Sequence, residues 1–163
     1  MASPKLQLPE TSILVDSREQ LPWEFITPTT SGALPYGDYS VAGLEHLIAI
    51  ERKSFSDLLG SLTSGRERFE TELKRARSLH RFFVIVECYP DDLLVESFGS
   101  VSRAHPRSIW GTICVWSTRY HPFLFGGTRE QSARYAEGIL LGYAAELTKG
   151  VKSMESANRR AER

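Results

Sequence analysis

Short apolar runs bounded by turn-forming residues recur along the 163-residue chain. The runs are rich in β-branched and aromatic residues, which is typical of buried strands. The predicted strands are residues 13–15, 38–41, 47–50, 82–86 and 122–125. The second and third strands are close in sequence and are expected to pair as a hairpin through residues 43–46. Residues 22–35 are interrupted by proline, threonine and glycine and are expected to be mainly loop.

Apolar residues spaced three or four apart predict helices between several of these strands. One such stripe consists of Phe69, Leu73, Ala76 and Leu79, and a later one consists of Ala136, Ile139, Leu140, Tyr143 and Leu147. Ser54 is a good N-cap for a short helix, and Pro106 suits the first turn of another. One predicted helix begins after Ser54, and the others span about residues 65–79, 92–96, 106–119 and 128–149.

Strands that alternate with helices predict an α/β fold in which a mixed central sheet is flanked by helices. The chain length is that of a single domain with a sizeable core. We expect a flexible N-terminal arm at residues 1–12, a folded domain at 13–150 and a basic, flexible tail at 151–163.

The composition, 41% hydrophobic and 25% charged, is typical of a soluble globular protein. No apolar run approaches the roughly 18 residues of a membrane span, and the first residues lack the layout of a signal peptide. Cys88 and Cys114 are too few for a disulfide framework and suit a reducing compartment. The histidines show no zinc-ligand spacing. We therefore expect an intracellular protein without a membrane partner, cytoplasmic or, in a eukaryote, nuclear.

The formal net charge is zero, but charge is sorted along the chain. Residues 65–81 contain six Lys or Arg against three Glu, and residues 149–163 contain five against two. A basic helix can follow a nucleic-acid backbone, because neutralised phosphates supply most non-specific affinity. An ordinary solvated helix face has the same pattern. The candidate DNA contacts are Arg68, Lys74 and Arg75, together with Trp23 as an aromatic residue that could stack on a base.

Acidic residues at predicted strand ends suggest a catalytic site. Asp38 begins one strand, while Glu51 and Lys53 follow the apolar residues of the next. Because side chains alternate faces along a strand, Glu51 and Lys53 are expected to point the same way. A hairpin would bring Asp38 to the same end of the sheet. A Glu-x-Lys alone is far more often a solvated ion pair, so it is the combination with Asp38 that favours a site.

This group of residues suits phosphodiester hydrolysis. Mg²⁺ prefers one or two carboxylates and retains several waters, so Asp38 and Glu51 could hold it. The metal would activate a water and offset charge in the transition state, while Lys53 would orient or deprotonate that water. Asp16 and Asp57 are candidates for a second metal site or for outer-sphere waters.

Gly37-Asp38 followed by Glu51-Arg52-Lys53 and Asp57 resembles the GD…ERKxxxD signature of the XPF/Hef-type structure-specific endonucleases. These enzymes belong to the restriction-endonuclease-like PD-(D/E)XK superfamily. Residues 15–19 are similar to the D-x-R-E end of that family's first strand, and residues 61–66 to its Ser-Ile-x-x-Gly-Arg segment. Specific motifs cover residues 13–87, and the order of elements agrees over about 12–150.

The resemblance implies a restriction-endonuclease-like fold and a role for each matching residue. It implies metal-binding carboxylates at Asp38 and Glu51, with Asp16 nearby, and a catalytic lysine at Lys53. The remaining motif positions would order the site or contact phosphate, and they are Arg18, Glu19, Arg52, Asp57 and Arg66. Mg²⁺ is the implied cofactor, and Mn²⁺ is expected to substitute for it.

The implied function is cleavage of DNA at branches or single-strand/double-strand junctions in repair, recombination or DNA processing. Many family members carry a tandem helix-hairpin-helix module after the nuclease domain, and some carry a helicase before it. The sequence is expected to contain neither, which leaves the preferred DNA structure open. The alternative is a non-catalytic DNA-binding or scaffolding module, because the family includes inactive partners. A nuclease for RNA or for one fixed DNA sequence is a third interpretation.

Related nuclease domains form dimers, so the helices at 106–119 and 128–149 are the expected homodimer surface. Trp110 and Tyr135 mark the side of these helices that would meet a second copy. Gly138 and Gly142 lie four residues apart on the second helix and would allow another backbone to approach closely.

Overall fold

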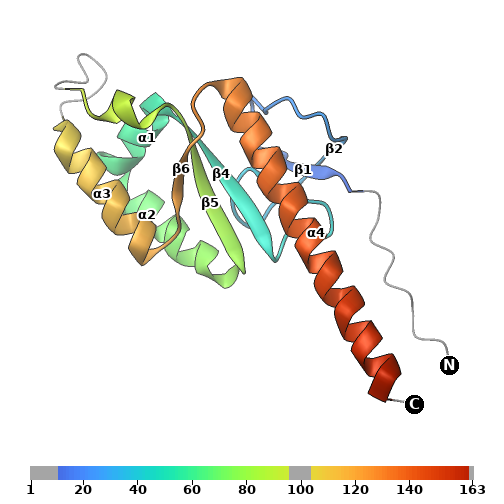
Figure 1. Cartoon of the computed structure of the whole chain (residues 1–163). Coiled ribbons are helices and arrows are strands. Elements are labelled where there is room, and N and C mark those ends of the chain that lie inside the picture. The colour runs from blue at the N-terminus through green and yellow to red at the C-terminus, as the bar shows by residue number, and fades with distance from the viewer. Residues whose placement is uncertain (1–10, 96–103, 162–163) are drawn as a thin grey trace.

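A mixed sheet lies between two layers of helices in the computed structural model, which describes residues 11–95 and 104–161 (Figure 1). The strands are β1 (Ile13–Asp16), β2 (Thr29–Gly32), β3 (Tyr39–Val41), β4 (Ile48–Ser54), β5 (Arg81–Glu87) and β6 (Phe123–Phe125). The helices are α1 (Phe55–Leu62), α2 (Arg66–Arg75), α3 (Pro106–Arg119) and α4 (Arg129–Ala161), with short 3₁₀ helices η1 (Ala76–Ser78) and η2 (Pro90–Leu93). In the described residues the sheet order is β2-β1-β3-β4-β5-β6. The predicted α/β fold is confirmed.

The two longest strands, β4 and β5, are parallel neighbours from the Ile48–Arg81 pair to the Ser54–Glu87 pair. β3 is antiparallel to both β1 and β4, so the predicted hairpin is confirmed. β6 continues the parallel part beside β5, and β2 is parallel to β1 at the opposite edge. The start of β3 therefore lies at the same end of the sheet as the carboxyl ends of β1, β4 and β5.

Neighbouring residues of the central strands belong to different cores, as the two-residue strand period requires. On β5, Val84 packs with α1, α2 and α3, whereas Ile85 packs with α4. Phe69 and Trp116 are almost fully buried on the first face, and Leu140 is buried on the second. Both apolar helix stripes predicted from the sequence thus cover the sheet, one on each face.

Three elements differ from the prediction. The sequence predicts loop where β2 lies, because residues 29–32 are polar and mostly exposed, and they join the sheet edge only through backbone pairing with β1. The chain after β5 forms the 3₁₀ helix η2 instead of a helix at 92–96. Residues 151–161, expected to be a flexible tail, are helical because α4 continues to Ala161. Most of the expected N-terminal arm, residues 1–10, lies outside the described residues.

The long helix α4 crosses one face of the sheet and continues beyond its end (Figure 1). Its last buried residue is Ala144. A Cβ atom placed on Gly138 or Gly142 would meet no described atom within 4 Å outside the helix itself, so no other segment of the described chain approaches closely there. No helix in the described part of the chain is both long and apolar enough to cross a membrane.

Candidate active site

The β3–β4 hairpin places Asp38 beside the end of β4. The Asp38 amide donates to the Ile50 carbonyl at 2.8 Å, and Asp38 Oδ2 accepts from the Arg52 N–H at 2.7 Å. The Asp38 carboxylate therefore accepts the hydrogen bond that a backbone carbonyl of a longer β3 would otherwise accept from β4. Gly37 makes this entry possible, because its φ is +70° and a Cβ atom there would lie 2.8 Å from the Ile50 carbonyl oxygen.

A Gly37→Ala variant is expected to be destabilised by about 2 kcal/mol, because the alanine would need both a left-handed backbone and a shift of β4. Gly43→Ala is the matched control, since Gly43 also has a positive φ (+86°) but nothing lies within 4 Å of an added Cβ. Urea unfolding of the two variants measures the difference. If both variants lose the same free energy of unfolding, crowding of the added Cβ against Ile50 contributes nothing.

Glu51 and Lys53 lie on the same face of β4, as predicted. Lys53 Nζ is 2.8 Å from Glu51 Oε1 and 4.5 Å from the centre of the Phe69 ring. Both side chains are largely buried, with 13% of Lys53 and 16% of Glu51 exposed. The ammonium thus lies between the Glu51 carboxylate and the face of the Phe69 ring.

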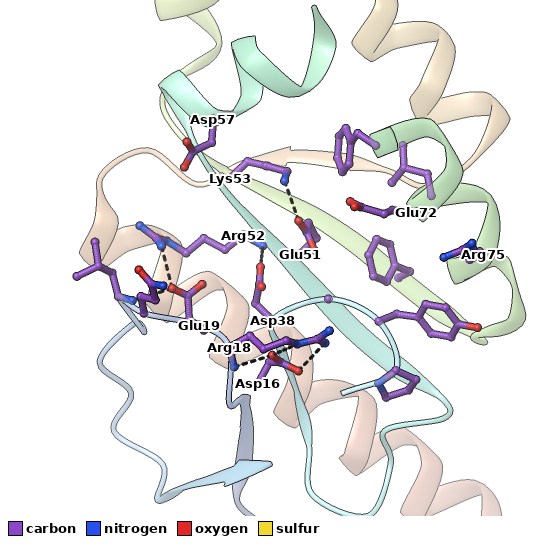
Figure 2. A pocket seen from close by; sticks show the side chains of 18 residues that line it. Asp16, Arg18, Glu19, Asp38, Glu51, Arg52, Lys53, Asp57, Glu72 and Arg75 are labelled. Carbon is purple, nitrogen blue, oxygen red and sulfur yellow. Dashed lines mark hydrogen bonds and ion pairs between the residues drawn. The ribbon is translucent and has the colours of Figure 1, made fainter. Parts of the chain in front are cut away.

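These side chains open into a pocket of about 820 Å³, here named the carboxylate pocket. Figure 2 shows Glu51, Lys53 and Asp38 around it, with Glu72 and Arg75 of α2 on one side and Arg18 on another. Asp57 also lines it from the first turn of α1, where Ser54 Oγ accepts from the Asp57 N–H at 3.1 Å and donates to Asp57 Oδ2 at 2.6 Å. The predicted Ser54 cap is confirmed.

Asp38 is the most strongly perturbed acid of the pocket. Its pKa is raised to about 7, mainly by burial and next by the nearby Glu51 carboxylate, while the hydrogen bond from the Arg52 N–H acts in the opposite direction. Two close carboxylates of this kind suit a divalent cation, because Mg²⁺ accepts one or two carboxylates and completes its shell with water. The residues thus fit the ion, although no described group of three or more His, Cys, Asp or Glu is arranged to hold a metal by itself.

Asp16 is committed to protein partners instead of facing the pocket freely. Its carboxylate accepts from Arg18 Nε at 2.7 Å, from Arg18 Nη2 at 2.9 Å and from the Leu34 amide at 2.7 Å. The Arg18 guanidinium lowers the pKa of Asp16 to about 2. Asp16 thus anchors the loop that follows β1, and because it also lines the carboxylate pocket its metal-binding role stays a prediction. Arg18, with 74% of its side chain exposed, remains available to a phosphate.

The Arg52 side chain leaves the opposite face of β4, lines another part of the pocket and binds a cluster of acids there. Its Nε donates to Glu87 Oε1 at 2.8 Å, and Nη1 lies 3.5 Å from Glu19 Oε1. Arg129, at the start of α4, also contacts Glu87 at 3.2 Å. The predicted supporting role of Arg52 and Glu19 thus has a geometric basis. Sequence reasoning missed Glu87, although it ends a predicted strand as Glu51 does, and Arg129, whose partners are distant in sequence.

Two predicted DNA contacts, Trp23 and Arg66, have partners within the chain. Trp23 was a candidate for base stacking, but only 3% of it is exposed, its ring stacks on Tyr39 at 4.8 Å, and its Nε1 donates to Glu87. Arg66 was a candidate for phosphate contact, but it turns toward α3, where it lies 4.9 Å from the Trp116 ring centre. Trp23 is therefore part of the core, whereas Arg66 is exposed and its phosphate contact stays a prediction.

The basic residues of α2 separate into two groups. Arg75 lines the carboxylate pocket, and Arg68 lines an adjoining pocket of about 570 Å³ that shares Arg52, Lys53 and Asp57 with it. Arg68 is 80% exposed and only 3.7 Å from Glu72. Lys74 lines neither pocket and lies 3.6 Å from Glu70. Of the three predicted DNA contacts on α2, only Arg68 and Arg75 therefore face the site.

A mixed sheet whose strand ends bring Asp38, Glu51 and Lys53 together defines a nuclease domain of the restriction-endonuclease-like, XPF type. The ERCC4 domain model matches residues 11–136. The chain therefore belongs to the ERCC4 domain family.

Solved structures support this assignment. XPF from Aeropyrum pernix is 25% identical, with a TM-score of 0.64 over 79% of this chain and 59% of that chain. XPF from Aeropyrum pernix in complex with DNA is 24% identical, with a TM-score of 0.66 over 83% of this chain and 66% of that chain. The chain thus spans 59–66% of the length of these relatives. No match was found among curated protein sequences.

Proposed function

We propose that this chain is a Mg²⁺-dependent endonuclease that hydrolyses DNA phosphodiester bonds, with Mn²⁺ as a substitute. The observation that supports this function best is the convergence of Asp38, Glu51 and Lys53 in one open pocket. Membership in the ERCC4 domain family and the similarity to XPF, which has been solved with DNA, agree with it.

In this proposal Asp38 and Glu51 hold the metal ion. When bound, the ion supplies Lewis-acid stabilisation of charge on the phosphate and lowers the pKa of a water. Lys53, positioned by the Glu51 contact, donates a hydrogen bond from Nζ to the scissile phosphate or the attacking water. Arg52 fixes the end of β4 through Glu87, and its N–H holds Asp38 in place.

The DNA backbone is proposed to run along α2, in contact with Arg68 and Arg75. These residues are seven positions apart, about 10.5 Å along a helix, or roughly three nucleotide steps of a strand. Arg68→Gln and Arg75→Gln are each expected to reduce the slope of log Kd against log salt by about one. Lys74→Gln, which removes an equal charge outside both pockets, should leave the slope unchanged. Fluorescence anisotropy with a short labelled DNA measures all three, and an equal effect of Lys74 would contradict this path.

The proposed substrates are branched DNA and single-strand/double-strand junctions, in repair, recombination or DNA processing. The test is incubation of the purified chain with labelled flap, fork, duplex and single-stranded DNA, and with RNA of the same sequence, in Mg²⁺, Mn²⁺ or EDTA. Junction cleavage that requires metal is the expected result. Cleavage of RNA alone would correct the substrate class.

The second candidate is a non-catalytic DNA-binding or scaffolding module. The retained Asp38, Glu51 and Lys53 favour activity, because a scaffold has no need of a buried carboxylate pair beside a lysine. Binding of DNA without cleavage of any substrate in either metal would support the scaffold.

A homodimer through α3 and α4 remains a proposal. These helices lie in opposite layers of the domain, so a common surface would have to extend across the edge strand β6 (Figure 1). Tyr135 is 46% exposed, whereas Trp110 stacks on Phe125 at 5.8 Å. Light scattering measures the mass, and a Tyr135→Glu variant would separate a dimer built on this surface.

A further inference from the structure

Leu21 is an exposed apolar residue at the rim of the carboxylate pocket. Its side chain is 67% exposed, and it lines the same pocket as Asp38 and Glu51. Among the described residues of that pocket, Leu21 is the most exposed large apolar residue, since Tyr36 is half-buried, and its neighbours Glu19 and Gln20 are polar. A single apolar side chain with a polar surround is too small for a protein-docking surface, which needs a contiguous apolar patch.

The backbone around Leu21 is held in place from three sides. Its amide donates to Glu19 Oε1 at 2.8 Å, while the carbonyls of Leu21 and Pro22 each accept from Arg129 Nη2 at 2.7 Å. The next residue, Trp23, is buried and donates from its amide to the Tyr39 hydroxyl at 2.9 Å. The loop is thus fixed to α4 and β3. Because it is already ordered, a ligand that contacts Leu21 would not have to order the loop backbone.

We propose that Leu21 packs against the face of an unstacked base beside the scissile phosphate, at the end of a duplex. This inference rests on the proposed function. Because Leu21 lines the same pocket as Asp38 and Glu51, a phosphate held beside those carboxylates would bring its flanking nucleotides near Leu21. Apolar side chains inserted at base steps stabilise unstacked geometry, because a base face is apolar while its edges are polar. Leu21 would thus select substrates in which a base next to the cut is already unpaired or easily unstacked.

The test compares cleavage of a fork, in which the cut lies at the duplex end, with cleavage of a single strand of the same sequence. Leu21→Ala is expected to lower kcat/KM about tenfold on the fork and less than about twofold on the single strand, which has no stacked partner to displace. Leu21→Met should restore the fork activity. Ile26→Ala is the matched control, because Ile26 is 89% exposed but does not line the pocket, and it should leave both substrates unchanged.

A second readout does not require cleavage. A fork with 2-aminopurine at the duplex end, mixed with protein in Ca²⁺, should become more fluorescent with the wild-type chain and with Ile26→Ala, but not with Leu21→Ala. Equal kcat/KM losses on both substrates, or an unchanged fluorescence rise with Leu21→Ala, would overturn the role of Leu21. Failure of the wild-type chain to cleave any substrate would instead overturn the proposed function.

Discussion

A Lys53→Met variant is expected to lose DNA cleavage by a factor of about 10³ while it keeps its fold, because it removes a preorganised donor from the site. Lys53 Nζ is positioned by Glu51 at 2.8 Å and by the Phe69 ring at 4.5 Å, so no reorganisation is needed when a phosphate enters. Methionine retains an apolar stem of similar length that can still pack on Phe69. Single-turnover cleavage of the best substrate, in saturating Mg²⁺, measures the effect on the chemical step.

Lys53→Arg serves as the control for charge. It restores a cation but not the compact ammonium, so an intermediate rate is expected. DNA affinity in Ca²⁺ should change less than about threefold in either variant if Lys53 acts mainly in the transition state. A Lys53→Met protein that cleaves at the wild-type rate would remove Lys53 from the mechanism, and a loss confined to affinity would make it only a phosphate contact.

The features of the site that could be predicted are those set by strand geometry. The two-residue period alone places Glu51 and Lys53 on one face and Arg52 on the other, and the structure has this arrangement. The hairpin fixes Asp38 because the connection is short and the register is local. The predicted core stripes of α2 and α4 follow from helical periodicity in the same way.

The features that could not be predicted depend on contacts between distant segments. Trp23 looks like an exposed loop aromatic until Tyr39 and Glu87 enclose it. Arg66 follows a glycine beside the motif, yet the packing of α3 against α2 determines its direction. Arg129 holds the carbonyls of Leu21 and Pro22 from more than a hundred residues away in sequence. No local pattern carries such information, because side-chain direction in loops and on helix faces is decided by the tertiary neighbours.

Asp38→Asn is expected to lower the rate of metal-dependent cleavage by a factor of about 10³ or more. The same substitution is expected to stabilise the metal-free folded protein at pH 8. The asparagine Oδ1 can still accept from the Arg52 N–H, so the hairpin is retained. The pKa of Asp38 is raised to about 7 from the ordinary 3.8, mainly by burial. Because the folded state binds the Asp38 proton more tightly than the unfolded state does, this group's contribution to the free energy of unfolding is fully present below about pH 4. The contribution is lost as the pH rises through 7. Asparagine cannot ionise, so we expect it to recover about 2 kcal/mol at pH 8.

Thermal unfolding in EDTA at pH 5 and pH 8 measures this effect, since the gain from Asp38→Asn should be small at pH 5 and appear at pH 8. Addition of Mg²⁺ at pH 8 should raise the Tm of the wild-type chain but not that of the variant, because a ligand that binds only the folded state stabilises it. Asp57→Asn is the matched control for charge, because Asp57 lines the same pocket but is exposed and held by Ser54. If Mg²⁺ raises the Tm of the wild type and of Asp38→Asn equally, the ion binds elsewhere. If cleavage is also lost in that case, Asp38 acts in catalysis without binding the metal.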